Sequence, residues 1–405
     1  GLGARVEAVL GAPYALADGP LFRAVLLVCG GERHVLAVGG HHSVLDGWSV
    51  ALLLHETSEI YEATVAGRAP VLPELPVQFA DFAAWQRDTL SAARIDAESA
   101  WWQQTLDGAP AAISLPTDRP RPPAMDYQGA TVDLLIPAEV TAQLNALAQA
   151  EGATLFMVLQ AAFSAFLSRL GAGDDVVVGT VVAGRPRAEL EGLAGFFVNT
   201  LALRHGVDGQ RSFRAQLGAA REVILAAYEH QDVPIDTIVE AVQPVRTTQH
   251  APLVQVMLAL QNAPGAADAL RLAGVSVNAF GTRKAVNALG AQFDLTVELT
   301  ETEQGLQGLL NYATQLFDED TALRLAEQFT HFVRHAAADP EQRVADLPLM
   351  DAVQERALLE RFSRIAELPA QPQTLPDLIW SRAQTAGQAP ALVEVLPQSV
   401  AAMPA

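Results

Sequence analysis

Cysteine and positive charge are both scarce in this sequence, and each shortage excludes a class of site. Cys29 is the only cysteine in 405 residues, so an intramolecular disulfide and a multi-cysteine metal site are ruled out. Because Cys29 lies in an apolar run, we expect it to fill core space, and a single thiol suits the cytoplasm. Lys and Arg total 26 against 46 Asp and Glu, a net charge of −20. This balance disfavours nucleic acid as a partner, because phosphate contacts need clustered positive charge.

Long uninterrupted apolar runs and a signal peptide are also not apparent. The apolar stretches are broken by charge, Gly or Pro, so we expect no membrane span and no membrane partner. Half of the residues are hydrophobic and 18% are charged, which is typical of a globular protein with a large core. The chain opens with Gly1 and not with Met, and we interpret it as a piece of a longer protein.

A proline-rich segment gives the clearest boundary in the chain. Residues 116–123 hold four prolines, which prevents a helix or a central strand there. Helical and strand patterns occur on both sides, which predicts an α/β (α+β layered) fold with two lobes. We place the lobes at 1–118 and 119–350, followed by a tail at 351–405.

Hydrophobic periodicity and capping residues predict the elements of both lobes. The predicted strands are 22–29 and 34–38, paired as an interior hairpin, followed by 130–136, 176–180, 196–204, 253–260, 293–299 and 308–312. The predicted helices begin at Asp46 or Ser49 and continue to about residue 61, followed by 77–106, 138–150, 154–169, 212–230 and 320–337.

Two adjacent histidines stand on the loop between the second strand and the following helix. Neighbours on an extended segment point to opposite sides, so we expect His41 and His42 to have different roles, one supporting the loop and one facing a cavity. Asp46 can orient an imidazole, pair with an arginine or cap the helix. Gly47 is expected to allow a backbone geometry that a side chain would forbid.

Acyl transfer from a thioester to an amine is the chemistry that would use such a loop. An imidazole can take the proton of the attacking amine, or it can stabilise the charged tetrahedral species. The competing interpretation is that both imidazoles are satisfied in a core. No third ligand follows at a spacing that suits a metal, and a Ser nucleophile elbow, a Gly-rich phosphate loop and a Cys–His pair are absent from the sequence.

Five segments in sequence order resemble those of condensation domains of non-ribosomal peptide synthetases. They are residues 41–49, which run His-His-Ser-Val-Leu-Asp-Gly-Trp-Ser, and then 79–85, 195–200, 230–234 and 252–257. The resemblance covers about residues 12–350. Within 351–405, residues 374–393 resemble the first stretch of an adenylation domain, without a nucleotide-binding segment.

The resemblance implies two chloramphenicol-acetyltransferase-like lobes in a V-shaped pseudo-dimer. It also implies amide-bond formation between thioesters on the phosphopantetheine arms of upstream and downstream carrier domains, with no cofactor or metal bound by the domain itself. His42 matches the catalytic histidine. Asp46 matches a structural aspartate paired with an arginine of the other lobe, for which Arg185 is our candidate.

The other family-like segments have structural interpretations that we favour. We expect Trp85 to lie in the core, residues 196–200 to form an interior strand, and Asn199 to satisfy backbone groups between the lobes. We expect His230 to end a helix, where positive charge complements the helix dipole.

Some positions depart from the family pattern. The family's first strand and helix are expected to be missing before Gly1. Gly39 and Gly40 replace larger apolar residues, which predicts a looser strand before the histidines. An epimerisation domain, a non-catalytic member that docks carrier domains and a transferase that uses coenzyme A thioesters remain alternatives.

Overall fold

The structure is a computed structural model that describes the chain except for residues 262–269, 279–289, 364–373, 386–389, 397–398 and 405. The chain forms two compact units, Gly1–Met350 and Asp351–Ala405. In the second unit, helices α11 (Ala352–Ser363) and α12 (Leu375–Thr385) have no buried residues, and strands β9 (Pro390–Leu396) and β10 (Ser399–Pro404) pair antiparallel. The first unit contains all of the candidate site residues.

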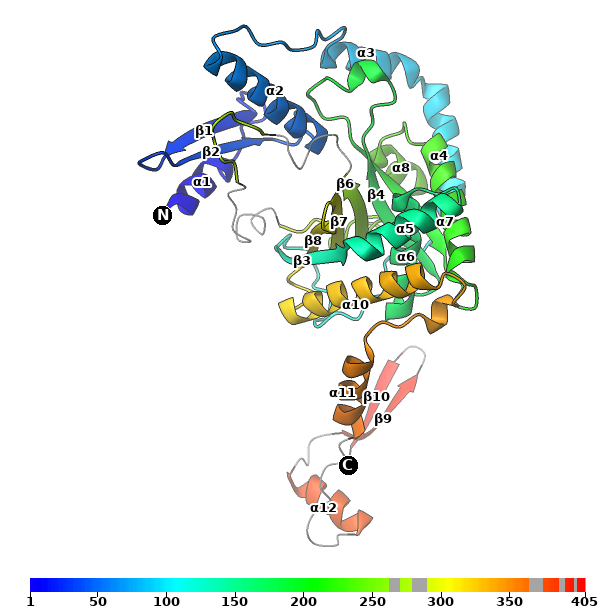
Figure 1. The fold of residues 1–405 in the computed structure, drawn as a ribbon. Helices are drawn as coiled ribbons and strands as arrows, with labels where there is room; N and C mark the ends of the chain where they lie inside the picture. Colours follow the sequence, from blue (N-terminus) through cyan, green and yellow to red (C-terminus); the bar gives the residue numbers. More distant parts are fainter. Residues whose placement is uncertain (262–269, 279–289, 364–373, 386–389, 397–398, 405) are drawn as a thin grey trace. The chain divides into compact units, whose positions relative to one another are not determined.

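A mixed six-stranded sheet forms the centre of the first unit (Figure 1). In spatial order its strands are β3 (Gly129–Pro137), β8 (Gly305–Ala313), β7 (Leu295–Thr302), β6 (Val256–Gln261), β4 (Asp175–Val182) and β5 (Asn199–Gly206). The β4–β6 and β6–β7 pairs are parallel and the other three pairs are antiparallel. The α/β prediction is therefore confirmed. Strand β6 starts three residues later than predicted, because Leu253 has a positive φ of 62°.

Four helices pack together beside this sheet, and two of them begin with the side-chain caps that the sequence predicts. They are α5 (Ala138–Ala150), α6 (Leu155–Leu167), α7 (Phe213–Glu229) and α10 (Glu319–Ala338). The Thr154 hydroxyl accepts from the Met157 N–H, and the Ser212 hydroxyl accepts from the Ala215 N–H, as expected at helix N-termini.

One helical segment in the described part of the chain, Leu155–Ala172, is long and apolar enough to cross a membrane by length and composition alone. Of its residues, 72% are buried inside the protein. Every residue of α6 is buried except the half-buried Phe156, and the helix is largely apolar because it fills the core.

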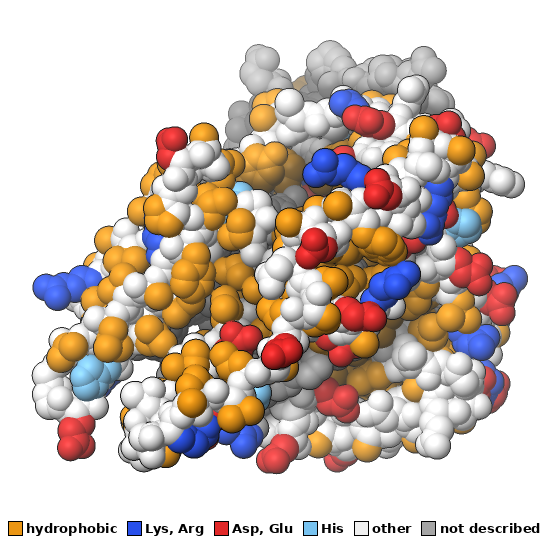
Figure 2. Space-filling view, turned by 90° about the horizontal axis from the view of Figure 1, so that it is seen from above, with side chains coloured by type: hydrophobic (Ala, Val, Ile, Leu, Met, Phe, Trp, Pro, Cys, Tyr) orange, Lys and Arg blue, Asp and Glu red, His pale blue; other side chains and the backbone are white. Residues whose placement is uncertain are grey.

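The N-terminal part of this unit consists of α1 (Leu2–Leu10), the antiparallel pair β1 (Phe22–Val28) and β2 (His34–Gly40), and α2 (Gly47–Val65). The hairpin prediction is confirmed, but the prediction that its strands are interior is wrong. Leu26 and Val28 are 60% and 70% exposed, and hydrophobic side chains gather on the side where these elements lie (Figure 2). Cys29 is likewise exposed beside the hairpin turn, so it does not fill the core.

The helix predicted over 77–106 is two helices, α3 (Phe79–Thr89) and α4 (Ala92–Leu106). The backbone leaves helical geometry at Leu90, which has ψ of 63°, and Ser91 then caps α4. Trp102 is fully buried, whereas Trp85 is 37% exposed and was wrongly predicted as core. The Trp85 ring packs against Phe82 and lies under the Arg187 guanidinium.

The proline-rich segment is fastened to the six-stranded sheet by a buried ion pair. Arg121 donates to both carboxylate oxygens of Asp294, whose side chain is 1% exposed. Burial of a carboxylate is tolerated when it is paired in this way. The lobe boundary at 118/119 stays a prediction.

His205 on β5 gives the fold a testable pH dependence. Its ring is buried, and neither ring nitrogen has a hydrogen-bond partner among the described residues. Desolvation lowers the pKa of His205 to about 4, from an ordinary value of 6.5. Between these values the unfolded chain binds a proton that the folded chain does not, so stability falls as the pH drops from 6.5 towards 4.

We predict that His205→Phe weakens this acid destabilisation. Unfolding free energy from urea titrations should fall by about 2–3 kcal/mol less in the variant than in the parent chain between pH 7 and about pH 4.5. The exposed His34, changed to Gln, is the control and should leave the pH dependence as it is. Equal acid sensitivity of His205→Phe and the parent chain would contradict the assignment.

Candidate functional site

The loop between β2 and α2 carries the two histidines and is held at its start by the neighbouring strand. The His41 N–H donates to the Leu21 carbonyl at 2.8 Å, and the Val44 N–H donates back to the His41 carbonyl at 3.0 Å. The chain therefore turns back on itself directly after β2. Rigid elements on both sides of a loop are the usual way to present functional side chains.

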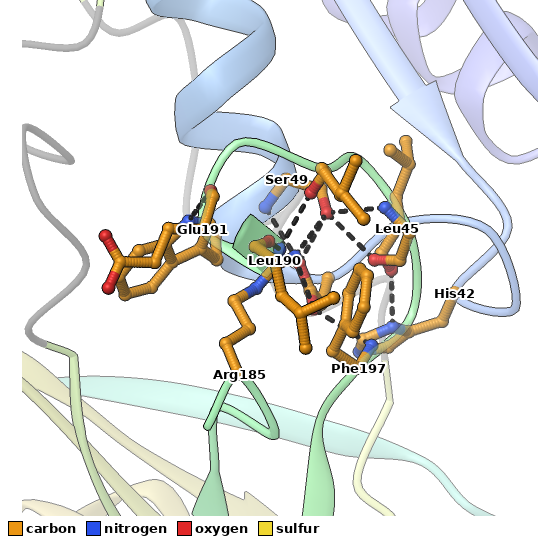
Figure 3. Close-up of polar contacts among 11 residues, drawn as sticks. His42, Leu45, Ser49, Arg185, Leu190, Glu191 and Phe197 are labelled. Atoms are coloured by element: carbon orange, nitrogen blue, oxygen red, sulfur yellow. Dashed lines mark hydrogen bonds and ion pairs between the residues drawn. The ribbon is translucent and has the colours of Figure 1, made fainter. Parts of the chain in front are cut away.

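His42 is exposed, and a backbone bond fixes its ring. Its Nδ1 lies 2.7 Å from the Leu45 carbonyl oxygen (Figure 3). Because a carbonyl only accepts, Nδ1 carries the hydrogen, and in the neutral ring Nε2 is then left as the acceptor. The Phe196 ring meets the imidazole edge to face at 5.1 Å and limits its rotation.

His41 has a different environment from its neighbour. It is half-buried, and its Nδ1 accepts from the Ser43 N–H at 3.2 Å and lies 2.8 Å from the Ser43 hydroxyl. Its ring meets Tyr14 edge to face. The bonds of His41 are therefore local to the loop, in keeping with the expectation that the two histidines differ in role.

Asp46 is a buried helix cap. It is 2% exposed and accepts from the Ser49 N–H at 2.8 Å and from the Ser49 hydroxyl at 2.6 Å. The Phe197 N–H donates to its other oxygen at 3.1 Å, which connects the loop to the segment before β5. Among the partners that the structure describes for Asp46, none is an imidazole.

Arg185 meets Asp46 across 139 residues of sequence. One terminal nitrogen lies 3.3 Å from each carboxylate oxygen, and the Arg185 and Asp46 side chains are 2% and 0% exposed. Burial lowers the pKa of the Arg185 guanidinium, while the Asp46 carboxylate raises it. The guanidinium also donates to the Leu193 carbonyl at 2.8 Å and lies 4.0 Å above the Phe197 ring.

Ser49 completes this node, although nothing in its sequence context marked it beyond a possible cap. Its hydroxyl is within bonding distance of Asp46, Arg185 and both backbone groups of Gly195. We define the buried polar node as Asp46, Ser49 and Arg185. It joins the first turn of α2 to residues 185–197 (Figure 3).

Three glycines of this region differ from expectation. Gly47 is the first residue of α2, has no positive φ, and a Cβ there would come no closer than 3.8 Å to the Gln261 Oε1 atom. A backbone geometry that only glycine can adopt is therefore not the reason why residue 47 is Gly. Gly39 and Gly40 do not loosen β2, because Leu10 packs closely on the first and Leu45 on the second.

Asn199 bonds within residues 119–350, whereas His230 bonds to residues of 1–118. The His230 Nδ1 lies 2.5 Å from the Glu98 carboxylate, and the His230 carbonyl accepts from the Trp102 indole N–H at 3.0 Å. Asn199 donates to the Gln231 and Val233 carbonyls at 2.8 Å, so the predicted bonds between lobes are wrong for this residue. His230 ends α7 as predicted, and its ring stacks on Trp101 at 4.0 Å. Phe196 lies before β5 and is 40% exposed, so the interior strand begins only at Asn199.

No group of three or more His, Cys, Asp and Glu side chains in the described part of the chain could hold a metal ion.

The chain as a whole is similar to the proteins of one family. The condensation-domain family matches residues 4–359. The chain is 40% identical over 382 residues to malpinin synthetase of Mortierella alpina, covering 94% of this chain and 5% of that protein. It is 37% identical over 363 residues to phosphinothricin tripeptide synthetase PhsC of Streptomyces viridochromogenes, covering 90% and 33%. The chain thus spans only a small part of these relatives.

Solved structures show the same similarity. The X-domain from teicoplanin biosynthesis matches with a TM-score of 0.76 and 30% identity, over 86% of this chain and 79% of that one. A four-domain nonribosomal peptide synthetase bound to AMP and glycine matches with a TM-score of 0.79 and 26% identity, over 96% and 30%. The first condensation domain of the calcium-dependent antibiotic synthetase matches with 0.65 and 26%, over 82% and 70%.

The buried polar node makes Asp46→Asn a sensitive variant. An amide keeps one acceptor for Ser49 but turns an N–H donor towards Phe197 or Arg185, and it leaves a buried guanidinium without its counter-charge. We predict a loss of about 2–4 kcal/mol in unfolding free energy, measured by urea denaturation, together with lower activity. Asp208→Asn, which removes an exposed ion pair with Arg211, is the control and should unfold like the parent. An unchanged unfolding free energy and full activity of Asp46→Asn would contradict the structural role of the buried polar node.

Proposed function

The chain belongs to the condensation-domain family of non-ribosomal peptide synthetases, and we propose that it forms an amide bond between two carrier-bound thioesters with His42 at the reacting centre. Its fold is the chloramphenicol-acetyltransferase-like α/β fold of that family. The donor would be an aminoacyl or peptidyl thioester, and the acceptor an aminoacyl thioester with a free amine.

The orientation of His42 is the observation that carries this proposal. The bond from Nδ1 to the Leu45 carbonyl leaves Nε2 as an acceptor on an exposed ring. An acceptor nitrogen held in one direction is what an amine nucleophile needs, since it must lose a proton as it attacks. Buried neutral histidines in a core would present no such free nitrogen.

The proposed reaction balances without a cofactor. The acceptor amine attacks the donor carbonyl carbon, the new C–N bond forms and the C–S bond breaks. The proton leaves the amine nitrogen for His42 Nε2 and passes to the departing thiolate sulfur. In the alternative role, the same Nε2, protonated, stabilises the tetrahedral oxyanion.

The other predicted residues support the loop in this proposal. Asp46 and Arg185 are positioning residues, because their described bonds reach the backbone, Ser49 and each other rather than the His42 ring. His41 holds the turn through Ser43. Gly47 begins α2 beside Gln261, and we propose that its bare Cα leaves room next to the loop.

We propose that the partners are upstream and downstream carrier domains, whose phosphopantetheine arms deliver the substrates in the cytoplasm. Residues 374–393 resemble the start of an adenylation domain, which fits a place within a longer synthetase. The domain itself would bind no cofactor.

A docking role is the second candidate, since one similar structure is an X-domain in complex with OxyB. A docking domain would need no oriented imidazole, and the geometry of His42 therefore favours catalysis. An epimerisation role would use the same loop and is separated by the product that forms.

We predict that His42→Ala lowers amide product by about 10²-fold or more when the chain acts within its synthetase and both carriers are loaded. Carrier loading and thermal unfolding should stay unchanged, because the exposed ring of His42 is not part of the buried polar node. His55→Ala, an exposed histidine on α2, is the control and should retain product formation. Normal product from His42→Ala would overturn the assignment and favour docking. Inversion of the donor without amide product would favour epimerisation.

A further inference from the structure

Gly40, the last residue of β2, makes room for the side chain of Leu45. A Cβ placed on Gly40 would lie 2.4 Å from Leu45 Cδ1 and 3.3 Å from Leu45 Cγ. The carbonyl oxygen of Leu21, the residue before β1, would stand 3.3 Å from the same Cβ. Any side chain at position 40 is therefore confined between the neighbouring backbone and Leu45.

Leu45 occupies this space as a buried residue. Its side chain is 9% exposed, and it directly precedes Asp46, which the buried polar node holds in place. The other end of the loop is fixed by the bond from the His41 N–H to the Leu21 carbonyl. The side chain of Leu45 thus fastens the middle of the loop onto the end of β2.

The backbone of the same residue orients His42. The Leu45 carbonyl oxygen lies 2.7 Å from His42 Nδ1, as Figure 3 shows. A shift of Leu45 therefore moves the carbonyl oxygen that determines which nitrogen of the His42 ring carries the hydrogen and where the ring points. To restore an ordinary contact of 3.4 Å from 2.4 Å, Leu45 Cδ1 would have to move by about 1 Å.

We propose that Gly40 is a positioning residue for His42, acting through the packing of Leu45 on its bare Cα. Only the activity test of this inference rests on the proposed function of His42. The neighbouring Gly39 gives a matched contrast, because a Cβ there would lie 2.8 Å from Leu10 Cδ2 of α1, on the opposite face of β2. Both glycines are closely packed, but only the packing of Gly40 leads to the His42 ring. The other neighbour of Gly39, the Tyr14 hydroxyl at 3.6 Å, belongs to a ring that packs on His41.

The activity test compares Gly40→Ala with Gly39→Ala in the synthetase with loaded carriers. Gly40→Ala should lower the single-turnover rate about tenfold or more, because the displaced Leu45 side chain would shift the Leu45 carbonyl and with it the His42 ring, and a misplacement of ~1 Å can cost up to ~10²-fold. Gly39→Ala should retain the rate within about threefold, even if both variants melt at a lower temperature. Equal rates in the two variants would contradict the proposal.

Coupling to Leu45 separates positioning from simple destabilisation. Leu45→Ala removes the two Leu45 atoms that the new Cβ would meet and leaves only the Leu21 carbonyl oxygen at 3.3 Å, so adding Gly40→Ala to that variant should cost less than about threefold in rate. A full tenfold loss in the Leu45→Ala background would show that Gly40 acts without Leu45 and would overturn the proposed route.

A spectroscopic test does not depend on catalysis. In ¹⁵N-resolved spectra of the 405-residue chain, the His42 ring signals, assigned by their loss in His42→Ala, should report hydrogen on Nδ1. Gly40→Ala should shift the ring towards a mixture of tautomers, while Gly39→Ala should leave the tautomer unchanged.

The two proposals fail in different ways. An unchanged tautomer in Gly40→Ala, for example after a rotation of the Leu45 side chain alone, would refute the positioning role whatever the activity. Normal product from His42→Ala, together with a shifted tautomer in Gly40→Ala, would refute the proposed function and leave the positioning role intact.

Discussion

The burial of one carboxylate, that of Asp46, is the constraint on which the site depends. A buried charge is strongly unfavourable unless it is paired and hydrogen-bonded, and Asp46 meets this need with Arg185, Ser49 and the Phe197 N–H. These partners come from α2 and from residues 185–197, far apart in the sequence. The first turn of α2 can therefore take only the position in which all of these bonds form together.

The position of α2 in turn fixes the loop that precedes it. Asp46 ends the loop, the strand partner Leu21 holds its start, and Leu45 packs onto Gly40 between them. The Leu45 carbonyl then sets the direction of His42. Under the proposed function, the carboxylate serves catalysis without touching the imidazole, because its effect passes through the helix cap and one backbone carbonyl.

Much of the fold was predictable from the sequence, because the strands and helices around the six-stranded sheet have strong periodicity and clear caps. The exposure of Cys29, Trp85 and part of the hairpin strands was not predictable. An apolar pattern shows which residues share one face of a helix or strand, but not whether another element covers that face. Family resemblance pointed to Arg185 as the partner of Asp46. The role of Leu45 had no sequence signal, because it acts through a backbone carbonyl that every residue type possesses.

The central claim is that Asp46 and Arg185 act as one unit, and a double-mutant cycle tests it most directly. Unfolding free energies would be measured by urea denaturation for Asp46→Ala, Arg185→Ala, the double variant and the parent chain. We predict a coupling energy of about 2 kcal/mol or more between Asp46 and Arg185, because the second substitution removes a charge that the first has left unpaired. Effects that add to within about 0.5 kcal/mol would show that the two residues contribute independently and would contradict the account.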